Sequence, residues 1–104
     1  MKEITPLELK QLKDSNANFQ LIDVREPHEA DVATIGGELI PMGDVLSNLD
    51  KIAKDKQVII YCRSGRRSGT IVQALEQQGF TNLYNLQGGI LQYADDVDNS
   101  LTKY

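Results

Sequence analysis

The residue most able to do chemistry is Cys62, the only cysteine of the chain. It follows an apolar run, Val58–Tyr61, and precedes a short segment that holds Arg63, Arg66 and Arg67. This pattern predicts a buried strand that ends at the cysteine and a helix that starts a few residues later. Helix N-termini carry unpaired amide groups and partial positive charge, so we expect this one to lower the pKa of the Cys62 thiol. Cys62 is therefore a candidate nucleophile.

The three arginines beside Cys62 oppose the charge of the whole chain. The sequence has 11 Lys and Arg against 15 Asp and Glu, which gives a formal net charge of -4. A nucleic acid partner favours a basic face with interleaved aromatic residues, and the sequence has no such pattern. We therefore expect no nucleic acid partner, and a cluster of three arginines suits a small anion instead.

Length and composition predict one globular domain, residues 1–104, with 40% hydrophobic and 25% charged residues. The apolar runs are too short to cross a bilayer, and the N-terminus does not resemble a secretion signal. One cysteine cannot form an internal disulfide, and an unpaired reactive thiol fits a reducing compartment. We expect a cytoplasmic protein without a membrane partner.

The single cysteine and the single histidine also limit the mechanism. No second cysteine can resolve an oxidised Cys62, so whatever group Cys62 takes up must leave to another molecule. A Cys-His pair would have to use His28, which stands next to Pro27 in a polar segment where an exposed histidine without a catalytic role is the ordinary case. One cysteine and one histidine do not make a closed metal site, so we expect no metal.

A second group of charged residues lies at the end of the apolar run Phe19–Val24, which contains Asp23, and in the segment after it, which contains Arg25 and Glu29. Ligands of open parallel sheets bind beyond the carboxyl ends of the strands, so these side chains could reach the same crevice as Cys62. We favour a structural, ion-pairing role for all three, with direct contact to the substrate as the alternative.

The rest of the chain predicts helices that alternate with strands. Thr5 and Glu8 form a capping-box pattern around Pro6, so a helix should begin there and bury Leu7, Leu9 and Leu12. Before the cysteine segment we expect a short strand near residues 38–41, a short helix over 42–49 and a charged connector over 51–57. After it we expect a helix over 67–78 that buries Ile71, Val72 and Leu75, a strand over 82–86 and a closing helix over 90–97. Such alternation predicts an α/β sandwich in which helices cover both faces of a mostly parallel sheet of about five strands.

Three motifs in order resemble those of rhodanese-like domains, over nearly the whole chain. Asp23–Glu29 resembles the first signature of the family, Cys62–Arg67 its six-residue active loop, and Leu86–Ile90 its C-terminal signature. The resemblance implies a three-layer α/β sandwich in which Cys62 carries sulfur as a persulfide. It also implies that the backbone amides of the loop, from Arg63 through Ser64, Gly65 and Arg66 to Arg67, bind the anionic substrate or sulfur.

A function follows from that resemblance: a sulfurtransferase that needs no metal or organic cofactor. The donor is expected to be a small sulfur anion such as thiosulfate, whose oxyanion end the arginines can bind. Since the chain has one cysteine, the acceptor must be external, either a thiol or a sulfur-carrier protein. The segment Gly37–Pro41 and the tail Val97–Tyr104 further resemble the C-terminal rhodanese domain of molybdopterin-synthase sulfurtransferases.

The sequence departs from the family pattern in two places. Ala30 and Ala33–Glu38 replace an aromatic residue and a Gly-His-Ile-Pro-Gly-Ala stretch, and Tyr93 stands near the usual C-terminal tryptophan. These departures affect local packing more than chemistry.

Two other functions remain as alternatives. A cysteine phosphatase or arsenate reductase has five residues between its cysteine and its arginine, which here would put the arginine at position 68, where the chain has serine. A noncatalytic module that keeps the fold for protein contacts is the other alternative, although such family members tend to lose the cysteine.

Overall fold

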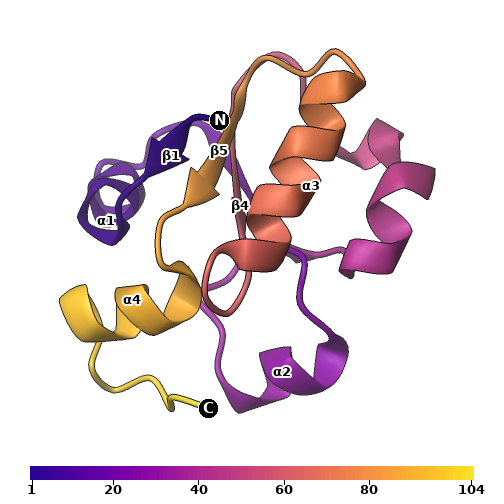
Figure 1. The fold of residues 1–104 in the computed structure, drawn as a ribbon. Coiled ribbons are helices and arrows are strands. Elements are labelled where there is room, and N and C mark those ends of the chain that lie inside the picture. The colour runs from indigo at the N-terminus through magenta and orange to yellow at the C-terminus, as the bar shows by residue number, and fades with distance from the viewer.

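The structure is a computed structural model that describes residues 1–104, and it has one sheet with helices on both faces (Figure 1). The strands are β1 (Glu3–Ile4), β2 (Phe19–Asp23), β3 (Glu38–Leu39), β4 (Gln57–Tyr61) and β5 (Leu83–Leu86). The helices are α1 (Pro6–Asp14), α2 (Pro27–Val32), α3 (Arg66–Gln77) and α4 (Gly89–Asp96), with two 3-10 helices, η1 (Met42–Ser47) and η2 (Leu49–Lys51). No helix combines the length and the apolar character that crossing a membrane requires.

The sheet has five strands in the order β1-β5-β4-β2-β3, and every neighbouring pair is parallel. The predicted α/β architecture is confirmed, and the sheet is entirely rather than mostly parallel. β4 lies at its centre, paired with β2 on one side and β5 on the other. The residue that follows β4 is Cys62, so the central strand delivers the cysteine to the carboxyl edge of the sheet.

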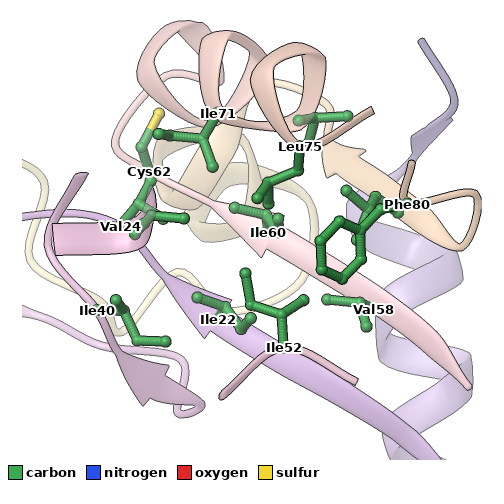
Figure 2. Close-up of a cluster of buried hydrophobic side chains, with 13 residues drawn as sticks. Ile22, Val24, Ile40, Ile52, Val58, Ile60, Cys62, Ile71, Leu75 and Phe80 are labelled. Carbon is green, nitrogen blue, oxygen red and sulfur yellow. The ribbon is translucent and has the colours of Figure 1, made fainter. Parts of the chain in front are cut away.

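Side chains of β4 alternate between two hydrophobic cores, because successive residues of a strand point to opposite faces. Val58 and Ile60 join the core under α3, whereas Ile59 and Tyr61 join the core on the face of α1 and α4. All four are fully buried, as expected for a central strand covered on both faces. Figure 2 shows the first core, with Cys62 at one end of it beside Ile71 and Val24.

The start of α1 follows the local prediction closely. Thr5 is the N-cap, its side chain accepts a hydrogen bond from the Glu8 amide, and the Glu8 carboxylate accepts one from the Thr5 amide. The predicted apolar stripe is only partly right. Leu9 is fully buried and Leu12 partly buried, but Leu7 is 54% exposed, since Leu7 lies on the side of this short helix that faces away from the sheet.

Other segments differ from the prediction in type. The polar segment around His28, for which no helix was predicted, forms helix α2 (Pro27–Val32), with Pro27 at its first position and Glu26 as N-cap. His28 is exposed on this helix. Met42–Ser47 and Leu49–Lys51 form two short 3-10 helices where one short helix over 42–49 was predicted, and Ile52 of the predicted charged connector is buried.

Candidate active site

Cys62 lies at the turn between β4 and α3. Gly65 is the N-cap of α3 and has a φ of +97°, in the left-handed region that glycine adopts without steric cost. This conformation turns the chain sharply, so that the first amides of α3 point back toward the residue that ends the strand. The sequence-predicted placement of a thiol between a strand and a helix N-terminus is confirmed.

The sulfur of Cys62 accepts hydrogen bonds from three donors. The Gly65 amide lies 3.1 Å from Sγ, the Ser68 amide 3.4 Å and the Ser68 hydroxyl 3.3 Å. Burial, with the residue only 1% exposed, opposes ionisation of the thiol. The hydrogen bonds from Ser68 and from the amides of Gly65 and Ser64 outweigh it and lower the pKa of Cys62. The site therefore favours a thiolate in a nearly water-free position.

Asn85, on β5, contacts both Gly65 and Ser68, two of the residues whose groups donate to the sulfur. Its side-chain amide donates to the Gly65 carbonyl at 3.0 Å, which orients its oxygen Oδ1 toward the Ser68 hydroxyl. A hydroxyl has one proton, so Ser68 shares it between Oδ1 of Asn85, the nearer acceptor at 2.5 Å, and the sulfur at 3.3 Å. Sequence reasoning missed Asn85, although a polar residue between Tyr84 and Leu86 in an otherwise apolar strand was an available signal.

The C-terminal signature supports the cysteine loop through the backbone. The amides of Ile90 and Leu91, in the first turn of α4, donate to the carbonyls of Cys62 and Arg63 at 3.0 and 3.1 Å. A Cβ on Gly89 would lie 2.4 Å from the Arg63 oxygen, and the φ of Gly89 is +62°. Only glycine lets α4 approach the loop this closely, which gives the Gly88–Gly89 pair a structural reason.

Of the three loop arginines, Arg67 is engaged in an ion pair. Its two terminal nitrogens donate to the two carboxylate oxygens of Glu29 at 2.7 and 2.8 Å. These hydrogen bonds from Arg67 lower the pKa of Glu29 to about 2, although burial opposes the shift. Arg63 and Arg66 are exposed. The predicted substrate-binding arginines therefore divide into two exposed side chains without an ion pair and one whose charge Glu29 balances.

Asp23 and Arg25 form a second pair, buried below the loop. Arg25 is fully buried, and its Nε and Nη2 donate to the two Asp23 oxygens at 2.9 and 2.8 Å. The same guanidinium donates to the carbonyls of Ala33 and Glu29. The hydrogen bonds with Asp23 outweigh burial and raise the pKa of Arg25. Both side chains thus face the protein interior instead of the crevice in which a substrate could meet them.

Nowhere in the chain do three or more His, Cys, Asp or Glu side chains gather in a way that could hold a metal ion. Every buried side-chain nitrogen and oxygen has a hydrogen-bond partner.

With the lone cysteine at the end of β4 and both flanking signatures packed around it, comparison with known families decides the relationship. Residues 5–96 match the model of the rhodanese-like domain. The chain belongs to the rhodanese-like family. The predicted resemblance is confirmed.

Relatives of this rhodanese-like chain include proteins of similar and of greater length. It is 37% identical over 95 residues to a protein of Allochromatium vinosum named "Sulfurtransferase", covering 90% of this chain and 89% of that protein. It is 38% identical over 104 residues to the Mycobacterium tuberculosis protein named "Probable adenylyltransferase/sulfurtransferase MoeZ". That match covers 97% of this chain but only 26% of MoeZ, so the chain spans about a quarter of that relative.

A solved structure agrees with the fold. The rhodanese-like domain protein from Staphylococcus aureus superposes with a TM-score of 0.84 at 33% identity, and the match covers 93% of this chain and 95% of that one. The five-stranded parallel sheet described above is thus the rhodanese-like architecture.

Proposed function

We propose that the protein is a sulfurtransferase that carries sulfur on Cys62. The proposal depends on one observation: the sulfur of the lone cysteine accepts hydrogen bonds from two backbone amides and one hydroxyl in a rhodanese-like loop. Such a position stabilises a thiolate, the form of cysteine that attacks sulfur.

The first half-reaction loads the sulfur. The Cys62 thiolate attacks the outer sulfur of a donor such as thiosulfate, a new S–S bond forms, and the old S–S bond breaks with its electron pair leaving on sulfite. The product is a Cys62 persulfide. We assign the binding of the negative outer sulfur to the first-turn amides of α3, among them those of Arg66 and Arg67, because these amides have no intrahelical partners.

We assign different roles to the residues of the loop, some in binding the donor and others in supporting the loop. Arg63 and Arg66, both exposed, supply charge-assisted hydrogen bonds to the oxyanion end of the donor. Ser64 and Gly65 contribute their amides, as the effect of both amides on the Cys62 pKa supports. We assign Arg67, together with Asp23, Arg25 and Glu29, to the support of the loop, because each of these four groups is paired within the protein.

The second half-reaction passes the sulfur on. An external acceptor attacks the outer sulfur, and the Cys62 thiolate leaves. No second cysteine can take this part within the chain. We propose a small thiol or a sulfur-carrier protein as the acceptor, and the match to MoeZ, whose name couples adenylyltransferase and sulfurtransferase, supports the latter.

Intact-mass measurement after incubation with thiosulfate tests the proposal. We expect one added sulfur atom per chain, removed by cyanide or dithiothreitol and absent in Cys62→Ser. Arg66→Ala should load less well at limiting thiosulfate. No adduct over a wide range of donor concentrations would overturn the proposal, and turnover of an aryl phosphate that depends on Cys62 would favour a phosphatase instead.

A further inference from the structure

The last residue of the chain, Tyr104, reaches the support of the cysteine loop. After α4 the chain continues through a turn at Asp98, whose amide donates to the Tyr93 carbonyl. The Tyr104 hydroxyl accepts a hydrogen bond from Nη1 of Arg25 at 2.8 Å and donates one to Oε2 of Glu29 at 2.9 Å. Figure 1 shows the C-terminus beside α2, the helix that carries Glu29. A residue 75 positions away thus completes the contacts of this carboxylate.

The contacts of the hydroxyl are with rigid groups. Arg25 is fully buried and held by Asp23 on two sides, so Nη1 cannot move to follow a displaced tail. Glu29 also binds both terminal nitrogens of Arg67. Tyr104 and Arg67 therefore share the Glu29 carboxylate as a partner.

The ring of Tyr104 lies near two guanidinium groups, that of the buried Arg25, 5.8 Å from the ring centroid, and that of Arg63. The Arg63 guanidinium lies 5.0 Å from the ring centroid, within the range of a cation–π interaction. Arg63 is otherwise exposed, so this ring limits the rotamers of a long and flexible side chain. Arg66, the other exposed arginine of the loop, has no such aromatic contact among the cation–π pairs of the structure.

We propose that Tyr104 is a positioning residue of the cysteine loop: its ring holds Arg63, and its hydroxyl supports the Glu29 carboxylate that pairs with Arg67. By holding these two cations, Tyr104 sets the preference of Cys62 for anionic over neutral reagents. The role of this preference in sulfur transfer rests on the function proposed above. The preference itself is a property of the folded protein and can be measured without any sulfur donor.

The test compares two alkylating reagents of similar size. Iodoacetate is an anion and iodoacetamide is neutral, and both react only at Cys62 among cysteines, because the chain has no other. The ratio of their second-order rate constants reports the positive charge that an anionic reagent meets near Cys62. The iodoacetamide rate alone reports the reactivity and accessibility of the thiolate.

Two variants of Tyr104 separate the contribution of its ring from that of its hydroxyl, and a third variant is the control. Tyr104→Ala should lower the iodoacetate-to-iodoacetamide ratio by about two- to fivefold, the effect of one exposed cation–π contact, with little change in the iodoacetamide rate. Tyr104→Phe keeps the ring and should give a smaller decrease. Lys103→Ala is the matched control, because it removes the exposed Lys103–Asp95 contact of the same tail and should leave the ratio unchanged.

A double-variant cycle makes the test specific. If Tyr104 acts through Arg63, then Tyr104→Ala should lower the ratio little further in an Arg63→Ala background. An unchanged ratio in Tyr104→Ala, or an equal fall in both alkylation rates, would refute the positioning role. If the wild-type protein takes up no sulfur from thiosulfate but the ratio changes as expected, the proposed function fails and the role of Tyr104 stands.

Discussion

Removal of the Ser68 hydroxyl is the sharpest test of how the site stabilises a thiolate. In Ser68→Ala the Cys62 sulfur loses the hydroxyl donor at 3.3 Å but keeps both backbone donors, from Gly65 and from residue 68 itself. The hydroxyl is one of the groups that lower the pKa of Cys62 against the opposing effect of burial. Its loss should therefore raise the thiol pKa and lower the thiolate fraction at neutral pH.

The expected magnitude follows from the hydrogen bond that is lost. A hydrogen bond to a charged group contributes about 1.5–3 kcal/mol. Ser68 shares its one proton with Asn85, so the lower end of this range applies, and about 1.4 kcal/mol corresponds to a factor of ten. The reaction of Cys62 with iodoacetamide should slow by up to roughly tenfold at pH values below the thiol pKa. The variant also leaves the buried Asn85 oxygen without its donor, which should lower the free energy of unfolding by about 1–3 kcal/mol.

The assay is the pH dependence of the iodoacetamide reaction. The profile of Ser68→Ala should move to higher pH and meet the wild-type rate at alkaline pH, where both thiols are ionised. Thr70→Ala is the control, because it removes another hydroxyl of α3 whose side chain is exposed and donates to the Arg66 carbonyl. A profile that coincides with that of the wild type, in a variant that remains folded, would refute the assigned role of Ser68.

Two further predictions concern stability and pH. Gly89→Ala should destabilise the protein by more than the roughly 1–2 kcal/mol of a left-handed backbone alone, because its Cβ would also collide with the Arg63 carbonyl; urea unfolding should show this loss, and Gly43→Ala, where nothing lies within 4 Å, is the control. The pKa of Glu29 is lowered from 4.5 to about 2, so its ion pair with Arg67 stabilises the fold above pH 4.5 and is lost as the pH falls toward 2. Glu29→Gln should therefore reduce the free energy of unfolding at pH 7 and flatten its decline between these pH values; a parallel decline in both proteins would contradict this role for Glu29.

Signals within short windows of sequence were enough to predict most of the elements. The capping box at Thr5, the apolar strands and the apolar face of α3 depend on neighbours a few residues apart, so a local pattern encodes them. The strand-end position of Cys62 and the polarity of its loop follow from the same kind of signal. Spacing and the three signatures then led to the rhodanese-like family.

Other features depend on contacts between residues that are distant in the chain. Glu29 pairs with Arg67 across 38 residues, Asn85 contacts Ser68 across 17, and Tyr104 reaches Arg25 across 79. No local pattern specifies such partners, because the packing of strands and helices brings them together. The same packing exposes Leu7, which a helical period alone had assigned to the core. The sequence therefore determined which residue is the candidate nucleophile and on which type of turn it lies. The tertiary structure decided which side chains surround its sulfur, since hydrogen bonds and ion pairs form only where the folded backbone places both partners.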